Sequence, residues 1–289
     1  MRFSEDALHT FTGSDGGSRN IHEWKPDPNG PRAVIVALHG GMAHAGDYVV
    51  PALFFKQHGI ATVSFDLAGH QGQARVDIPH FDIFLNDVVL FLDWVEAHYP
   101  HLPIWVMGHS MGGLIATHLE LKGLLNRPHI KGVVLSSPYF VNAIRVPPWL
   151  EKAAGMLATL LPKAKVPLPR VTDQLTHDPV ITARHHADEH DHIRALEASF
   201  RFAHSLMKAQ AALNGNLSRW KHPVFAVLAG QDLLANTAAS QAWLNTIPNG
   251  LLTAYTYPEN YHENFNELNR EKIFHDILNW ASHEQILGL

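Results

Sequence analysis

Short apolar or β-branched runs alternate along this chain with longer segments of helical periodicity. Runs of the first kind are typical of strands, and segments whose apolar residues recur every three to four positions are typical of helices. Repetition of strand, helix and strand predicts a mostly parallel sheet with helices on both faces. The expected strands are 33–40, 60–67, 103–109, 131–137, 223–230 and 251–258, and the expected helices include 81–99, 114–125 and 263–284.

Two stretches depart from this alternation. The first 25 residues alternate more weakly and predict an antiparallel hairpin at one edge of the sheet. From Pro138 to Lys208 no run predicts a strand, and the stretch is proline-rich at first and then helical. An insertion of this size after a strand predicts a helical cap over the carboxyl edge, where sheets of this class bind ligands. The predicted division is a core of residues 1–137 and 209–289 with a cap of 138–208.

Composition narrows the class of protein. The chain has 289 residues, 46% of them apolar, as expected for one α/β domain with an insertion. Its net charge of −5 and its lack of a Lys/Arg block exclude a phosphate-tracking surface, so we expect no nucleic-acid partner. With no cysteine there is neither a disulfide nor thiolate chemistry. The N-terminus lacks a signal-peptide pattern and no apolar run approaches roughly 18 residues, which predicts a cytoplasmic protein, at most peripheral to a membrane.

The stretch Gly108-His109-Ser110-Met111-Gly112 fits the pattern G-x-S-x-G between an expected strand and an expected helix. In that context the pattern predicts a nucleophile elbow, a turn so sharp that the serine hydroxyl is pushed above the sheet. Side chains at Gly108 and Gly112 would collide in so sharp a turn, and Gly113 lets the helix start close to the strand. The alternative interpretation is a glycine-rich turn with a bystander serine.

A serine nucleophile needs a base, and the base needs an acid that orients it. In this topology they follow in the order serine, acid, histidine. Asp232 comes just after an expected strand, and His262 lies in the loop between the last strand and the last helix. Both positions belong to the carboxyl edge that carries Ser110. Asp232 as a turn or capping residue, with Glu259 or Glu263 as the acid, remains the competing assignment.

The oxyanion of an acyl-transfer intermediate needs two preset N–H donors. Met111, the residue after the serine, offers one at the positive end of a helix. Gly41 in the loop after the first core strand is predicted to offer the other, with Gly40 allowing close approach. A simple turn at His39-Gly40-Gly41 is the alternative.

With these motifs in place, the chain resembles the monoacylglycerol lipase and lysophospholipase group of the α/β-hydrolase fold, also grouped with serine aminopeptidase-like hydrolases. The resemblance implies that fold, a triad of Ser110, Asp232 and His262, oxyanion donors at Gly41 and Met111, and no cofactor. The chain departs from the usual sequence of this family in having Asn236 in place of an acidic residue and Ala43-His44 in place of Glu-His. The motifs that carry it are "LHGG" (38–41), "FDLAGH" (65–70), "GHSMGG" (108–113), "LSSP" (135–138), "GQD" (230–232) and "YHENFNE" (261–267).

Within the expected cap, segment 149–161 has an apolar face wider than a packed surface helix needs. Trp149, Met156 and Leu157 are therefore candidates to contact an acyl chain, and the same face suits transient contact with a membrane or micelle. A well-buried cap helix explains the pattern equally well.

His186 and His190, four residues apart, have the spacing of zinc ligands. We expect a solvated helix there instead, and no metal.

The expected function is that of a serine carboxylester hydrolase, which releases a fatty acid from monoacylglycerol through an acyl-enzyme. Lysophospholipase, thioesterase and aminopeptidase-like activities on the same triad are alternatives. A binding protein without catalysis on this fold is a more remote one, because all three triad positions are filled.

Overall fold

The computed structural model describes residues 2–26, 30–70, 72, 75–143, 148–166 and 170–284, with the backbone only for 148–152. Eight strands form the central sheet in the order β1-β2-β4-β3-β6-β7-β10-β11, and from β4 onward neighbouring strands are parallel. The strands are β1 (Ala7–Thr12), β2 (Ser18–Trp24), β3 (Ala33–Leu38), β4 (Ile60–Phe65), β6 (Ile104–His109), β7 (Ile130–Ser136), β10 (Val224–Ala229) and β11 (Leu252–Tyr257).

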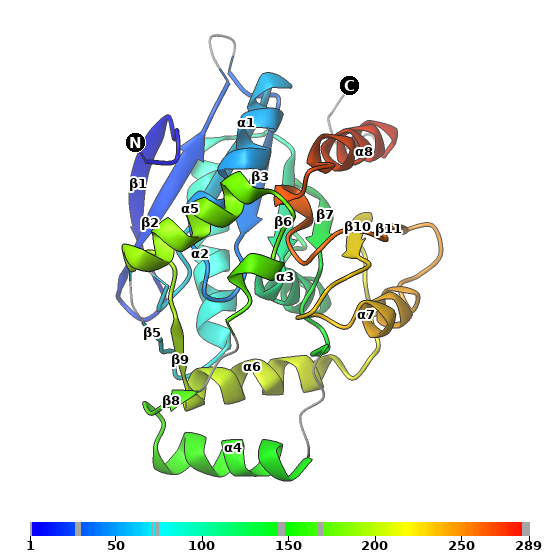
Figure 1. The fold of residues 1–289 in the computed structure, drawn as a ribbon. Helices are drawn as coiled ribbons and strands as arrows, with labels where there is room; N and C mark the ends of the chain where they lie inside the picture. Colours follow the sequence, from blue (N-terminus) through cyan, green and yellow to red (C-terminus); the bar gives the residue numbers. More distant parts are fainter. Residues whose placement is uncertain are drawn as a thin grey trace.

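Helices cover both faces of this sheet (Figure 1). On one face lie α1 (Val49–Gln57) and α8 (Arg270–His283), which contact each other. On the other lie α2 (Asp82–His98) and α3 (Met111–Leu121), and α7 (Thr237–Leu244) adds Leu244 to the same apolar cluster. The core is accordingly divided in two by the sheet, which leaves β3, β4 and β10 buried along their whole length.

The predicted fold class is confirmed, and each of the six expected strands is present within about one or two residues of its expected ends. The expected edge hairpin is the antiparallel pair β1–β2. Three helix boundaries were wrong. The helix expected at 114–125 begins at Met111, directly after the elbow serine, and ends at Leu121. The one expected at 263–284 begins only at Arg270, because Asn264–Asn266 forms a separate 3-10 turn, η3.

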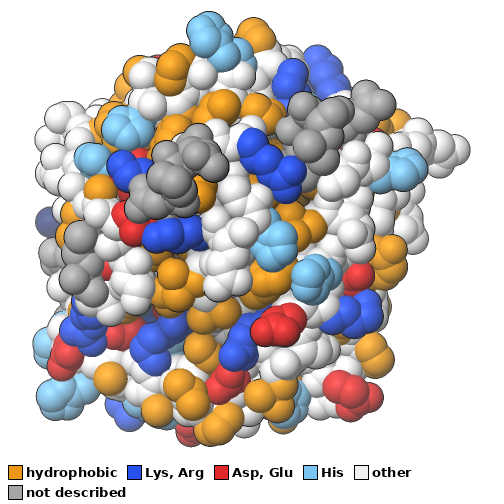
Figure 2. All heavy atoms as spheres, turned by 90° about the horizontal axis from the view of Figure 1, so that it is seen from above, with side chains coloured by type: hydrophobic (Ala, Val, Ile, Leu, Met, Phe, Trp, Pro, Cys, Tyr) orange, Lys and Arg blue, Asp and Glu red, His pale blue; other side chains and the backbone are white. Residues whose placement is uncertain are grey.

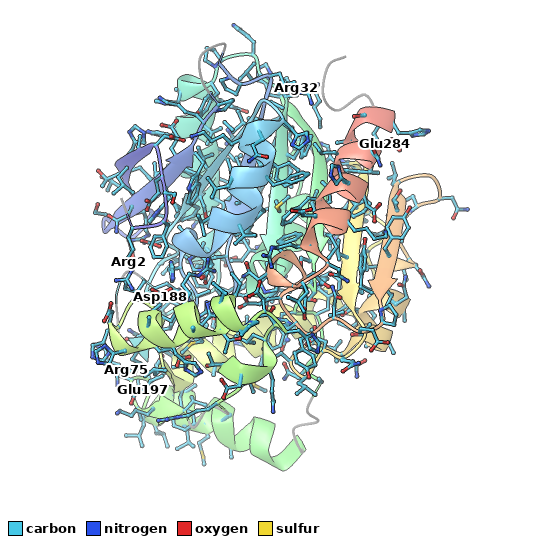
Figure 3. The ribbon with its side chains drawn as sticks, turned by 45° about the horizontal axis from the view of Figure 1, so that its top comes forward. Arg2, Arg32, Arg75, Asp188, Glu197 and Glu284 are labelled. Atoms are coloured by element: carbon cyan, nitrogen blue, oxygen red, sulfur yellow. The ribbon has the colours of Figure 1, made fainter. Side chains whose placement is uncertain are left out.

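The segment between β7 and β10 carries three helices, α4 (Pro148–Leu160), α5 (Pro179–His190) and α6 (Phe200–Leu213), and a 3-10 turn, η2 (Thr172–Gln174). Our expectation of no strand there was wrong. Two short strands, β8 (Lys165–Val166) and β9 (Glu197–Ser199), join β5 (Arg75–Val76) in a small separate sheet. Runs of two or three residues are too short to produce a readable alternation. Figure 3 shows Arg75 and Glu197 side by side in this sheet.

Helices α6 and α4 are stacked beyond the carboxyl ends of the parallel strands, whereas α5 crosses obliquely in front of the sheet in this view (Figure 1). Helix α6 lies between the sheet and α4, so α4 forms the outermost layer. Where the structure is described, no helix combines the length and apolar character needed to cross a bilayer. The opposite end of the molecule, seen in Figure 2, mixes acidic, basic and apolar side chains over its surface.

Candidate active site

The elbow at Ser110 has the geometry that its sequence predicts. Ser110 joins the end of β6 to the first residue of α3 with φ 52° and ψ −116°, a conformation that side chains rarely adopt. Its N–H donates to the Ser136 carbonyl on β7 at 2.9 Å, and its carbonyl accepts from Tyr139 N–H at 3.1 Å. The strained residue is therefore held by the last residue of β7 on one side and by the loop that follows β7 on the other.

The glycines around Ser110 are required by contact with backbone. A Cβ at Gly108 would lie 2.7 Å from the Gly113 nitrogen, and a Cβ at Gly112 would collide with the Leu38 carbonyl at the end of β3. At Gly113 a Cβ would approach Pro138 to 3.0 Å. The neighbours of Gly112 are backbone, which has no rotamer to move away.

Asp232 and His262 meet at the same sheet edge. His262 Nδ1 lies 2.8 Å from Asp232 Oδ2, and both side chains are almost completely buried. The other carboxylate oxygen accepts N–H bonds from Leu234 at 2.8 Å and Ala235 at 2.9 Å. Burial raises the pKa of Asp232, but His262 and the two backbone donors outweigh it and hold the pKa below its usual value. An ionised Asp232 fixes the proton of His262 on Nδ1 and leaves Nε2 free to accept one.

The two competing acids face elsewhere. Glu259 accepts a bond from the side chain of Gln231 at 3.1 Å on the surface. Glu263 turns away from His262 and accepts a bond from His185 Nε2 at 2.7 Å. The geometry supports Asp232 as the partner of His262.

Residues 39–42 lie directly against the elbow. A Cβ at Gly40 would stand 3.3 Å from Ser110 Cβ, and one at Gly41 would stand 3.7 Å from Met111 Sδ. The buried ring of His39 accepts the Leu67 N–H on Nε2 at 3.0 Å, so its Nδ1 carries the proton and donates to the Gly40 carbonyl at 2.8 Å. Burial, helped by the neighbouring His70, lowers the pKa of His39 to about 3, so the ring stays neutral. His39 thus fixes the loop that carries Gly41.

Sequence reasoning missed a buried ion cluster centred on Arg194. Its guanidinium donates to Asp47 Oδ2 at 2.6 Å, to His185 Nδ1 at 2.9 Å and to Glu263 Oε1 at 3.3 Å. The Glu263 carboxylate also accepts from Asn266 Nδ2 at 2.8 Å. Burial raises the pKa of Glu263, but His185 and Arg194 hold it well below its usual range. Arg194 thereby joins the segment after α5 to the loop that carries His262.

The same segment reaches the loop beside the elbow. Ala195 N–H donates to the Met42 carbonyl at 3.0 Å, next to Gly41. Asp188 on α5, seven residues before Ala195, accepts from Arg2 at 2.7 Å and faces His44 Nε2 at 3.3 Å. Figure 3 shows Arg2 beside Asp188. The only sequence signal for this cluster is a run of alternating charges near 184–194, which surface helices share.

The predicted cap residues lie on the outermost helix. Met156 is 59% exposed and Leu157 is half-buried, while the side chain of Trp149 lies outside the described residues. The face of α4 toward α6 is instead marked by Ala158, which is buried. Of the histidine pair with zinc-like spacing, His186 bonds Asp173 at 2.7 Å and His190 bonds Asp191 at 3.0 Å.

Comparisons with known proteins agree with this fold. The family described as serine aminopeptidase, S33, matches residues 29–269. Phospholipase YtpA of Bacillus subtilis is 31% identical over 255 residues, covering 87% of this chain and 95% of that protein. A monoacylglycerol lipase of Mycolicibacterium smegmatis is 30% identical over 288 residues, covering 98% and 100%. A soluble variant of monoglyceride lipase from Saccharomyces cerevisiae, solved with a substrate analogue, superposes with a TM-score of 0.83 at 19% identity, covering 97% of this chain and 96% of that one.

Replacing Asp232 with Asn should lower kcat by about 10⁴-fold, because the amide favours the wrong tautomer of His262. KM for a soluble ester should change little, since Asp232 does not face the substrate. Glu259→Gln, on the same surface, is the matched control and should retain normal turnover. A large loss in the Glu259 variant with a normal rate in the Asp232 variant would reverse the assignment.

Replacing Arg194 with Met should cost about 3–5 kcal/mol of unfolding free energy, because the Asp47 and Glu263 carboxylates lose their buried cation. Arg201→Met, which removes a partly exposed pair with Asp77 at 2.6 Å in the same insertion, should cost at most about 1 kcal/mol. Denaturant melts of the two variants measure the difference. Equal losses would mean that the Arg194 cluster contributes no more than a surface pair.

Proposed function

Because this chain belongs to the serine aminopeptidase S33 family of α/β-hydrolase enzymes, within its monoacylglycerol lipase group, we propose that it hydrolyses single-chain lipid esters through Ser110. The observation that carries this proposal is the 2.8 Å hydrogen bond between His262 and the buried Asp232, at the sheet edge that holds the strained serine. A bystander serine needs neither the strain nor the oriented imidazole.

In the proposed reaction, Ser110 Oγ attacks the ester carbonyl while His262 Nε2 takes the hydroxyl proton. The carbonyl oxygen becomes an oxyanion and accepts N–H bonds from Met111 and Gly41. When the tetrahedral intermediate collapses, the bond to the leaving alcohol breaks and His262 returns the proton to that alcohol. The acyl group stays on Ser110.

Water then repeats the sequence on the acyl-enzyme. His262 removes a proton from the water, the hydroxide attacks the acyl carbonyl, and Ser110 leaves with the proton that His262 gives back. The products are a free fatty acid and the original enzyme. His109, whose ring lies 4.8 Å from that of His262, stays neutral throughout, because burial lowers its pKa to about 4.

An ester fits the charges of the site better than a peptide. An aminopeptidase must bind a free ammonium group with an available carboxylate. Of the described carboxylates beside His262, Asp232 is bonded to that ring and Glu263 to His185 and Arg194. A phospholipid ester remains the second candidate, because the Bacillus subtilis relative carries that name at similar identity.

We further infer that residues 138–208 form the cap, and that α4 makes transient contact with a membrane or micelle. Three apolar side chains are exposed at the end of this outermost helix and just after it: Met156 at 59%, Leu160 at 67% and Leu161 at 56%. Apolar side chains clustered at one place on a surface mark an interaction site, whereas scattered ones do not. Lipid aggregates supply the matching surface, and Trp149 and Leu157 of the same helix remain candidates to contact the acyl chain.

The chemistry is tested with Ser110→Ala and His262→Ala on a panel of monoacylglycerols, lysophosphatidylcholine, acyl-CoA and a chromogenic aminopeptide. We expect the wild type to prefer monoacylglycerol. Each variant should lose about 10⁴-fold or more in kcat, because the triad residues act together and removal of one abolishes the contribution of all. A fluorophosphonate probe should label the wild type at Ser110. Ser110→Ala protein with a tenth of normal activity would falsify the nucleophile.

The cap is tested with Met156→Asp. This exposed substitution should leave the melting temperature unchanged and lower kcat/KM for micellar long-chain monoacylglycerol by about tenfold, which equals about 1.4 kcal/mol. Hydrolysis of a soluble two-carbon ester should be unaffected. Leu8→Asp, a similar charge change at a residue 54% exposed on β1, is the control and should alter neither rate. Equal losses on both substrates would remove the argument for lipid contact.

A further inference from the structure

Two histidines converge on one buried carboxylate at the edge of the sheet far from Ser110. His9 comes from β1, Glu23 from β2, and His98 is the last residue of α2. His9 Nε2 lies 3.1 Å from Glu23 Oε2, and His98 Nε2 lies 3.2 Å from Glu23 Oε1. The three side chains come from segments up to 89 positions apart in the sequence, so the fold itself assembles the group.

These separations match those between the ligands of one metal ion. Around a tetrahedral zinc ion with bonds of about 2.0–2.1 Å, neighbouring donor atoms lie about 3.3 Å apart. The three ligand atoms of this group all lie within 4.8 Å of one another. Two imidazoles and a carboxylate form a donor set that Zn²⁺ accepts, with a fourth position left for water.

Neighbouring side chains hold the group in place. The Tyr99 hydroxyl donates a short hydrogen bond to Glu23 Oε1, which orients the carboxylate. The ring of Trp94 lies 4.6 Å from that of His98 and 5.3 Å from that of His9, so one indole supports both imidazoles. Such outer contacts set the orientation of metal ligands in established sites.

The group is also accessible from the surface, and the lysine that faces its carboxylate is largely in solvent. His9 is 31% exposed and His98 37%, whereas Glu23 is completely buried, so an ion can enter from the histidine side. Lys25 Nζ lies 3.7 Å from Glu23, but its side chain is 44% exposed and free to move.

A second described group has the same kind of side chains, but cations already bond its carboxylates. It consists of His44, Asp47 and Asp188. Arg194 bonds Asp47 at 2.6 Å, and Arg2 bonds Asp188 at 2.7 Å. Guanidinium groups already supply the positive charge there, so that group does not fit a metal ion.

We propose that His9, Glu23 and His98 bind a Zn²⁺ ion that fastens the β1–β2 hairpin to the end of α2. Each histidine then gives up the Nε2 proton that it shares with Glu23 and carries its proton on Nδ1. The ion lies outside the proposed active site, so its effect is on stability.

The test is calorimetric titration of the chelator-stripped full chain with ZnCl₂. We expect one site that disappears in His98→Ala and in His9→Gln, the second of which keeps a side-chain N–H able to bond Glu23. At about 100 times its Kd, Zn²⁺ should raise the Tm of the wild type by about 5 °C and leave the Tm of both variants unchanged. Bound Co²⁺ should give visible absorption bands in the wild type only.

The matched control is His101→Ala with His129→Ala, a pair of rings 5.8 Å apart, of which His101 is exposed and His129 half-buried and neither belongs to the group around Glu23. This double variant should keep the site. Zinc binding of unchanged stoichiometry in the His9 and His98 variants, loss of the site in the control, or no binding by the wild type would each overturn the proposal. Because every readout is independent of ester hydrolysis, the outcome is separate from that of the proposed function.

Discussion

The backbone turn at Ser110 is the constraint on which the arrangement of the carboxyl edge depends. A residue other than glycine with positive φ is tolerated only where its surroundings over-determine it. Here the end of β7 and the loop after it hold Ser110 by two backbone hydrogen bonds, and Gly112 lets α3 start against the end of β3. Three central strands and one helix therefore have to meet at fixed separations, and the loop that carries Gly41 has to run across the gap that remains.

That loop and the His262 loop share a second support, the Arg194 cluster. The carboxylates of Asp47 and Glu263 both bond the guanidinium of Arg194, and the imidazole of His185 accepts a bond from Arg194 and donates one to Glu263. The ion pairs and hydrogen bonds among these side chains offset the free-energy cost of removing the charged groups from water. The elbow therefore depends on the core of the sheet, whereas the residues proposed to work with Ser110 depend on contacts with the inserted segment.

The sequence predicted those features that leave a local signature. Strong periodicity identified the sheet and most helices, and glycines at fixed offsets from Ser110 identified the elbow because steric exclusion acts between near neighbours. The positions of Asp232 and His262 directly after expected strands predicted that both lie at the carboxyl edge of the sheet. Arg194, His185 and Asp47 were not predictable, because their pairing joins positions up to 147 apart and each residue alone looks like a solvated surface charge. The strands β8 and β9 were not predicted for a different reason: strands of two or three residues pair through their backbone and need no particular side chains.

The burial of Arg194 has a consequence for motion. Separating it from Asp47 or Glu263 would leave a charge without a partner in the interior, at a cost of about 3–5 kcal/mol. A conformation with that contact open is populated below about one part in a hundred. The segment from α5 to β9 is therefore fixed to the sheet, whereas α4 is held chiefly through its packing on α6. The insertion accordingly consists of an inner part that is fixed to the sheet by buried charges and an outer helix that can be displaced without separating any of them.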